Sequence, residues 1–286
     1  KKVAREELLA DAEDFGDERR SPLVKREPAQ ALSETALIPA EPITVVLSRK
    51  GWVRAAKGTE INPRELSYRG EDGYLHSGTG RTNQPLLCID STGRVYGLRS
   101  HELPSARGMG EPVGKQLKTP AGASFCGVMI GDNDSRYLLA SDAGYGFVAT
   151  FEELLTRNKS GKAVLSARGA GVLPPQRVFD YEDDWVCAIT DSGRLLIFPL
   201  AELPLLSRGK GVKLVNIPPA RYKSGEEKLA GIAVFREGDS LQLYAGKQHM
   251  RLKPSDVENF IGARAQRGRA LPRGYKRPTA IEVIHE

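Results

Sequence analysis

Five short segments of the chain repeat one pattern, and this repeat limits the fold more than any other feature. Each segment has an apolar run, a turn that ends in glycine, and a second run of mixed or alternating character. The segments are TVVLSRKGWVRAAKG, LLCIDSTGRVYGL, YLLASDAGYGFVAT, VCAITDSGRLLIFPL and LQLYAGKQHMRL. The turn glycines are spaced by 42, 51, 49 and 53 residues, and they are Gly51, Gly93, Gly144, Gly193 and Gly246. Because glycine supplies the positive φ that closes a hairpin, each segment is predicted to be a β-hairpin.

The shared register extends to both sides of the glycine. Three residues before it, the first four units have a short side chain that can hydrogen-bond to the turn backbone, namely Ser48, Asp90, Ser141 and Thr190. Ten residues after it, the same units have Ile61, Leu103, Leu154 and Leu203. The fifth unit has Asp256 at that position, and terminal repeats are often atypical.

This period predicts an all-β fold of five blades over residues 38–286. A repeat of 42 to 53 residues with strands and no sustained helical pattern indicates about four strands per unit. The blades then form a propeller-like ring, and the sequence leaves a closed or an open ring undecided. We expect the first strand of each hairpin to be the inner one. Cys88 and Cys187 fall in these strands, where a free thiol is a packing residue.

The N-terminal residues differ in kind from the repeats. Leu8, Ala12 and Phe15 lie at helical spacing and Gly16 is a natural helix stop, so a short helix is predicted. The polar, proline-containing residues after it are expected to form a linker or an extended arm, with a domain boundary between residues 37 and 38. Because the chain begins at Lys1, we expect it to be a fragment of a longer protein.

The net charge of +6 is unevenly distributed. Residues 1–36 carry 7 basic and 9 acidic side chains, so residues 37–286 hold 35 basic and 27 acidic ones, a net charge of +8. Three stretches have five or six basic residues and no carboxylate: 154–179, 203–225 and 259–281. Glycine-rich basic strings follow four of the hairpins: SARGMG, TRNKSGK, SRGKGVK and GARAQRGR. The positive charge therefore recurs in phase with the hairpins.

Other functions find little support in the sequence. The three cysteines form no CxxC pair, which fits a reducing cytoplasm, and no apolar run approaches the roughly 18 residues of a membrane helix. The four histidines show no metal-ligand spacing. Around Lys115, GMGEPVGKQ has the wrong glycine spacing for a phosphate loop. No catalytic residue, metal or cofactor is therefore predicted on this chain.

Basic loops in one phase would form a continuous belt when the blades close into a ring. A curved positive belt suits a bent polyanion, with phosphates contacted and no base being read. The 19 aromatic residues do not interleave with the basic stretches, which favours duplex DNA over a single strand. The residues predicted to bind DNA are Arg107, Arg157, Lys159, Lys162, Arg208, Lys210, Lys213, Arg264, Arg267 and Arg269.

Several longer motifs carry a family resemblance. They are NQPLLCIDSTGRVYGL, LPSARGMGEPVG, ASDAGYGFVATFEELLTRNKSGKA and LLSRGKGVKLVNIP, and with them the chain resembles the C-terminal domain of ParC, the A-type subunit of bacterial DNA topoisomerase IV. FGDERRSPL resembles the end of the breakage-and-reunion region of ParC, which places residues 1–37 there. The resemblance implies a β-pinwheel, in which neighbouring blades exchange strands, with a basic rim that binds and bends DNA.

The resemblance also implies a role and partners. It implies a non-catalytic domain that presents duplex DNA to the cleavage core of a cytoplasmic enzyme, for decatenation and relaxation of supercoils. That enzyme, topoisomerase IV, joins two copies of ParC with its B-type subunit, and uses ATP and magnesium outside this domain. The related A-type subunit of DNA gyrase carries a QRRGGRG box, which this chain lacks. Three alternatives remain: a gyrase-like DNA-wrapping domain, a propeller-like module that binds an acidic protein and, more weakly, a blade-fold enzyme with a site in the central channel.

Overall fold

The computed structural model describes residues 2–16, 38–246 and 248–285, and the chain divides into two compact units, Lys1–Leu37 and Ile38–Glu286. In the first unit, helix α1 (Lys2–Phe15) has the predicted end, where the Gly16 N–H donates to the Ala12 carbonyl at 3.1 Å. The predicted linker and most of FGDERRSPL lie outside the described residues. The helix is therefore confirmed, and the assignment of residues 1–37 to the breakage-and-reunion region stays a prediction.

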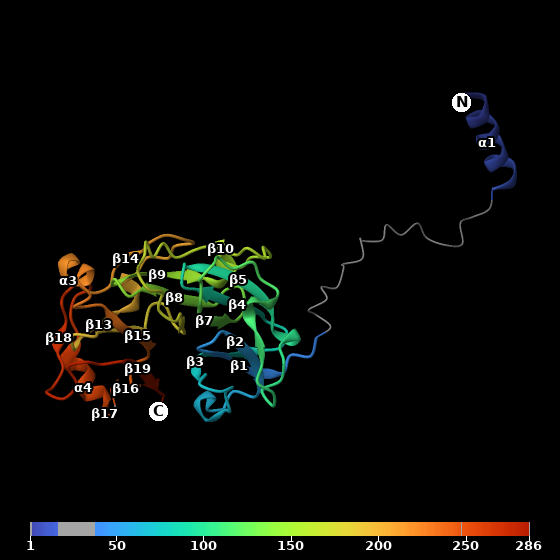
Figure 1. Ribbon diagram of the computed structural model, residues 1–286. Helices are drawn as coiled ribbons and strands as arrows, with labels where there is room; N and C mark the ends of the chain where they lie inside the picture. Colours follow the sequence, from blue (N-terminus) through green and yellow to red (C-terminus); the bar gives the residue numbers. More distant parts are fainter. Residues whose placement is uncertain (1, 17–37, 247, 286) are drawn as a thin grey trace. The chain divides into compact units, whose positions relative to one another are not determined.

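The second unit consists of five antiparallel sheets, one for each predicted hairpin, and the sheets follow one another around a ring (Figure 1). This confirms the five-bladed fold. The hairpins are β1 (Pro42–Ser48) with β2 (Trp52–Lys57), β4 (Pro85–Asp90) with β5 (Arg94–Arg99), β8 (Arg136–Ser141) with β9 (Tyr145–Thr150), β12 (Trp185–Thr190) with β13 (Arg194–Pro199), and β16 (Ser240–Ala245) with β17 (Gln248–Leu252). We number the blades 1 to 5 in this order.

A third strand pairs with the first strand of each hairpin. These third strands are β3 (Tyr74–Arg81), β7 (Phe125–Ile130), β11 (Gln176–Val178), β15 (Leu229–Phe235) and β19 (Ala280–Ile284). They contact one another from sheet to sheet, β3 with β7, β11 with β15, and β15 with β19, so they form the inner edge of the ring. The first strand of each hairpin is the inner one of the two, as predicted, but it is not at the inner edge of the sheet. That strand lies second, because the third strand covers its inner edge.

The fourth strands are exchanged between blades. They are β6 (Glu111–Pro112), β10 (Lys162–Ala163), β14 (Val212–Lys213) and β18 (Arg269–Ala270). Strand β6 follows the hairpin of blade 2 in sequence but pairs with β2 of blade 1. In the same way, β10 pairs with β5 of blade 2, β14 with β9 of blade 3 and β18 with β13 of blade 4. The chain thus joins blades 1 to 5 by four strand exchanges, as the resemblance implied. Blade 5 has only three strands among the described residues.

Short helices occupy the connections between these strands. In the second unit they are η2 (Pro63–Glu65), η3 (Ser100–Glu102), η4 (Val113–Lys115), α2 (Phe151–Leu154), η5 (Leu200–Glu202), α3 (Pro219–Lys223), α4 (Pro254–Val257) and η6 (Glu258–Phe260). None of those described exceeds five residues.

The apolar core lies between the blades, in four clusters of buried side chains. Each cluster fills one junction between consecutive blades, and alternate residues of a central strand face opposite junctions. Leu87 packs in the junction with blade 3, whereas the next residue, Cys88, packs in the junction with blade 1. Both this thiol and that of Cys187 are fully buried, which confirms them as packing residues and raises their pKa values.

The turn glycines secure the exchanged strands as well as the hairpins. In blades 1 to 4 the glycine N–H donates to the carbonyl three residues earlier at 3.0 Å, and its φ lies between 77° and 84°. Its own carbonyl accepts an N–H from the residue after the exchanged strand, as from Leu214 to Gly144 at 2.8 Å. The same pattern holds for Val113 with Gly51, Val164 with Gly93, and Leu271 with Gly193.

A second glycine precedes every exchanged strand. Its φ lies between 69° and 89°, and a Cβ atom there would come within 2.1 to 2.6 Å of the preceding blade; the four are Gly110, Gly161, Gly211 and Gly268. At Gly211 the obstacle is the carbonyl oxygen of Gly146, the residue that pairs with Val212. Only glycine lets the chain cross this closely.

Replacing Gly211 by alanine should therefore destabilise the fold more than positive φ alone does. Gly122 is a matched control, because it has the same φ of 76° but nothing within 4 Å of a built Cβ atom. We expect about 1–2 kcal/mol from Gly122→Ala and about 1–3 kcal/mol beyond that from Gly211→Ala, measured by urea unfolding. Equal losses in the two variants would contradict the close approach.

The imidazole of His76, in strand β3, generates a pH dependence. Its Nδ1 accepts the Val128 N–H at 3.2 Å, and burial lowers the pKa of the imidazole from 6.5 to about 4. Between these two pH values the unfolded chain binds a proton that the folded chain does not. Stability should therefore fall as the pH drops from 6.5 towards 4, by up to about 3 kcal/mol from this group, since one pKa unit is worth about 1.4 kcal/mol.

We expect His76→Gln, which keeps an acceptor without titrating, to lose less stability between pH 7 and pH 5 than the unmodified protein. Urea unfolding at both pH values measures this difference. The exposed His249 provides the control, and His249→Gln should follow the unmodified protein. An unchanged pH dependence in His76→Gln would refute the assignment.

Candidate nucleic-acid interface

Four loops carry the chain from one blade back to the preceding one, and we call them the crossover loops: 104–110, 155–161, 204–211 and 261–268. Together they hold seven basic residues and no carboxylate. Each runs into an exchanged strand, and the remaining three predicted residues, Lys162, Lys213 and Arg269, lie in those strands. All ten residues predicted to bind DNA therefore belong to one repeated structural position.

Hydrogen bonds to the preceding blade fix the course of these loops. The Ala55 N–H donates to the Pro104 carbonyl at 2.9 Å, and the Val148 N–H donates to the Pro204 carbonyl at 3.1 Å. In the last crossover loop the Gly262 N–H donates to the Ile197 carbonyl at 2.9 Å. The loops thus lie against the second hairpin strand with their backbone partly paired.

Three arginines in the second strands of the hairpins donate hydrogen bonds to the same loops. Arg54 is 3% exposed and its Nη1 donates to the Gly108 carbonyl at 2.8 Å. Arg94 donates to the carbonyls of Ser160 and Gly161, both at 3.0 Å, and Arg194 donates to the Gly268 carbonyl at 3.1 Å. These three residues were not among those predicted from the sequence. The sequence could have indicated Arg94 and Arg194, because both directly follow the turn glycine, in the strings STGR and DSGR.

The last three crossover loops are also hydrogen-bonded to the segments that follow the preceding exchanged strands. The Lys118 N–H donates to the Lys159 carbonyl at 2.8 Å, and the Ser166 N–H donates to the Gly209 carbonyl at 2.8 Å. The last connection is from the Ala265 N–H to the Leu214 carbonyl at 2.9 Å. The segment after each exchanged strand thus meets the next crossover loop. We call this series of four loops, with their exchanged strands, the belt.

Five of the predicted residues have exposed side chains on the belt and make no side-chain hydrogen bond or ion pair with any residue that the structure describes. They are Arg107, Arg157, Lys159, Arg208 and Arg269. Three others are partly buried and engaged. The amine of Lys162 donates to the Glu153 carbonyl, Lys210 lies 3.5 Å from the centre of the Tyr145 ring, and Lys213 donates to Asn216 Oδ1 at 3.3 Å.

Other kinds of site find no support in the described part of the chain. Among residues 2–16, 38–246 and 248–285, no group of three or more His, Cys, Asp or Glu side chains could hold a metal ion. In the same residues, no helix has both the length and the apolar character to cross a membrane. The belt is thus the feature on which a functional argument rests.

Solved structures of known proteins have the same fold. A solved structure of the Escherichia coli ParC C-terminal domain matches with a TM-score of 0.71 and 42% identity, over 86% of this chain and 100% of that one. This chain belongs to the ParC C-terminal domain family. The family model described as DNA gyrase C-terminal domain, beta-propeller, matches residues 184–236. A gyrase A C-terminal domain at 15% identity has a TM-score of 0.63, which shows a common fold.

Full-length relatives extend beyond this domain. The A-type subunit of DNA topoisomerase 4 from Pseudomonas aeruginosa is 51% identical over 99% of this chain, and that from Escherichia coli K12 is 44% identical over 98%. The chain spans 38% and 37% of the lengths of these two relatives. It therefore corresponds to a part of the ParC protein.

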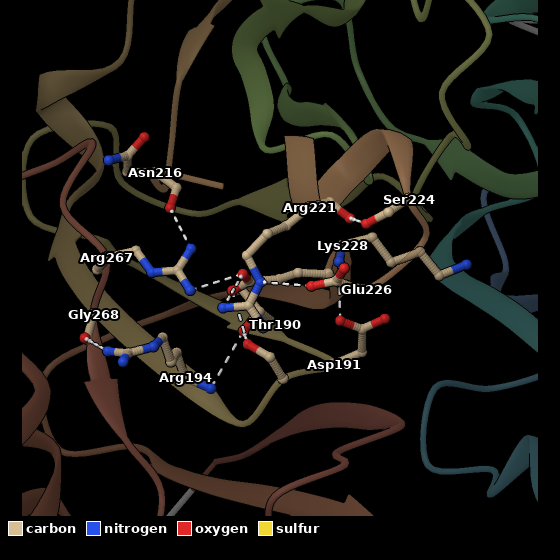
Figure 2. A network of polar contacts seen from close by, with 12 residues as sticks. Thr190, Asp191, Arg194, Asn216, Arg221, Ser224, Glu226, Lys228, Arg267 and Gly268 are labelled. Atoms are coloured by element: carbon tan, nitrogen blue, oxygen red, sulfur yellow. Dashed lines mark hydrogen bonds and ion pairs between the residues drawn. The ribbon is translucent and has the colours of Figure 1, made fainter. Parts of the chain in front are cut away.

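Two residues of the last crossover loop in this ParC-type domain have internal partners. Arg267 is 26% exposed; its Nη2 lies 2.7 Å from Glu227 Oε2, and its Nη1 donates to the Asn216 carbonyl at 3.2 Å. Arg264 donates to the Lys213 carbonyl at 2.7 Å. Figure 2 shows Arg267 between Asn216 and Arg221. The guanidinium groups of Arg264 and Arg267 thus connect blades 3, 4 and 5.

Glu227 is the centre of this network. Its side chain is fully buried and accepts the Ser192 hydroxyl at 2.7 Å, while Arg221 Nη1 lies 3.6 Å away. Burial raises the pKa of the carboxyl, but the hydrogen bonds from Ser192 and Arg267 outweigh it and hold the pKa below its usual value. The carboxylate therefore stays charged at neutral pH. It joins a hairpin turn, helix α3 and a crossover loop.

Replacing Glu227 by glutamine should destabilise the domain by about 1.5–3 kcal/mol, since hydrogen bonds to charged groups have this value and two arginines lose their buried partner. The neighbouring Glu226 is a matched control: its side chain is 61% exposed and lies 3.4 Å from Arg221. Thermal and urea unfolding of both variants measure the effect. Glu226→Gln should change stability by less than about 0.5 kcal/mol, and similar losses in both variants would refute the network's role.

Proposed function

We propose that the belt binds and bends duplex DNA without reading its base sequence. The observation that carries the proposal is the continuous connection of the four crossover loops, each with at least one basic residue and none with a carboxylate. The exposed cations follow a curved ring of blades. Phosphates contacted along such a curve hold a duplex in a bent path, and the contacts repay the bending energy.

The absence of a suitable reading element supports binding that is independent of sequence. An α-helix or a two-stranded ribbon is what proteins insert into the major groove to read base edges. The described belt consists of loops and two-residue strands, and the crossover loops lie against the hairpin of the preceding blade. Arginine and lysine side chains on such loops reach phosphates and carry no sequence information.

The full activity belongs to the longer protein. We propose that the domain presents a duplex segment to the cleavage core of bacterial topoisomerase IV in the cytoplasm, and so favours decatenation and supercoil relaxation. The enzyme would contain a second copy of ParC and two copies of the B-type subunit. We assign DNA cleavage and the magnesium-dependent use of ATP to the parts of the enzyme outside this chain.

DNA binding should depend steeply on salt. If about 6 to 10 phosphates are neutralised, the affinity for a random duplex should fall roughly 10³- to 10⁵-fold between about 50 and 200 mM salt. Removing two exposed belt cations with Arg157→Gln/Arg208→Gln should lower the slope of log K against log salt by about 0.9 for each lost contact. Fluorescence anisotropy with labelled duplexes of unrelated sequence measures both effects.

A control variant separates the belt from net charge alone. Arg81 is exposed on β3, which lies at the opposite edge of blade 1 from its exchanged strand. The single belt variant Arg157→Gln is therefore compared with Arg81→Gln, which removes the same charge away from the belt. This variant should retain most of the affinity and the slope. Affinity that does not respond to salt, a strong preference for one base sequence, or equal loss in both variants would overturn the proposed function.

A further inference from the structure

The junction between blade 5 and blade 1 differs from the other four. Residues 58–73 come after the hairpin of blade 1, in the position that the crossover loops have after the hairpins of blades 2 to 5. They lay no strand on blade 5, whose described strands are β17, β16 and β19. None of the four apolar clusters of the described residues fills this junction. We call residues 58–73 the seam segment.

Polar contacts of one arginine join the two blades across this junction. Arg64 of the seam segment pairs with Glu282 of strand β19, and its guanidinium lies 5.9 Å from the centre of the Tyr244 ring in strand β16. The Tyr244 hydroxyl donates to Glu282 at 2.9 Å. The first and last blades therefore meet, and the ring closes through side chains where the other junctions have exchanged strands.

The seam segment also borders the belt directly. Buried Arg54 donates to the Ser67 carbonyl of the seam segment and to the Gly108 carbonyl of the first crossover loop, both at 2.8 Å. One guanidinium group thus holds the two segments side by side. A duplex that runs along the first crossover loop would reach the seam segment next.

The charge of the seam segment is opposite to that of the crossover loops. It holds four carboxylates, Glu60, Glu65, Glu71 and Asp72, against Arg64 and Arg69, a net charge of −2. Both arginines are engaged, because Arg64 pairs with Glu282 and Arg69 lies 5.5 Å from the centre of the Trp52 ring. Glu60 and Glu71 are exposed and have no side-chain partner among the described residues. Phosphates approaching this segment would meet uncompensated negative charge.

We propose that the seam segment ends the DNA path. A duplex then follows the four junctions that have exchanged strands, and it leaves the ring at the junction of blades 5 and 1. This deepens the proposed function and rests on it. The carboxylates limit both the length of bound DNA and the total bend. The seam segment thereby confines the duplex to an open arc, although the protein ring itself is closed by contacts.

The test compares two variants of the 286-residue chain with equal changes of charge. Glu60→Lys/Glu71→Lys should lengthen the hydroxyl-radical footprint on a linear duplex and bring its labelled ends closer in energy transfer. It should also steepen the salt slope by about 0.9 for each added phosphate contact. The control is Glu182→Lys/Glu237→Lys, at exposed residues of the loops before β12 and β16. It should leave the footprint length and the bend unchanged.

The outcomes separate this inference from the function on which it rests. A wild-type footprint that the seam variant does not extend, or that the control extends equally, would overturn the seam proposal and leave DNA binding by the belt intact. If the wild-type chain gives no footprint, the proposed function fails, and the seam proposal fails with it. Both variants change exposed side chains, and circular dichroism verifies that they are folded.

Discussion

The fold depends on the pairing of each hairpin's outer edge with a strand from the next blade. An unpaired edge strand exposes a row of backbone donors and acceptors and can pair with another chain. Here a two-residue strand covers part of that edge in four blades, and it arrives only after the chain has completed the next hairpin. The same pairing thus protects the edge, fixes the order of the blades and places a loop outside each junction.

Much of this could be predicted from the sequence, because the hairpins are local structures. The glycine register identifies all five turns, and the nearly continuous burial of the central strands in blades 1 to 4 follows from their apolar runs. The position of the third strand could not be derived in this way. A period of about fifty residues gives the number of strands in a blade, but the position of Tyr74–Arg81 on the inner side of β1 is set by pairing between distant segments.

The candidate site divides in the same manner. The ten predicted cations recur at similar distances after their hairpins. Because each crossover loop has the same relation to its hairpin, all ten lie at one repeated structural position. Whether a cation faces solvent was not predictable. Arg267 meets Glu227, forty residues earlier in the chain, because strand exchange returns its loop to blade 4. Lys210, which precedes the corresponding glycine one blade earlier, lies over the Tyr145 ring instead.

Net charge is therefore a poor measure of the charge that a polyanion would meet. The repeats have an excess of eight basic residues, yet several arginines are used inside the protein. Arg54, Arg94 and Arg194 donate to carbonyls of the crossover loops and help to hold the backbone of these loops. These internal cations set the shape of the belt, and the exposed ones give it a surface charge. Separating the two classes required the contacts of each guanidinium group, which composition does not contain.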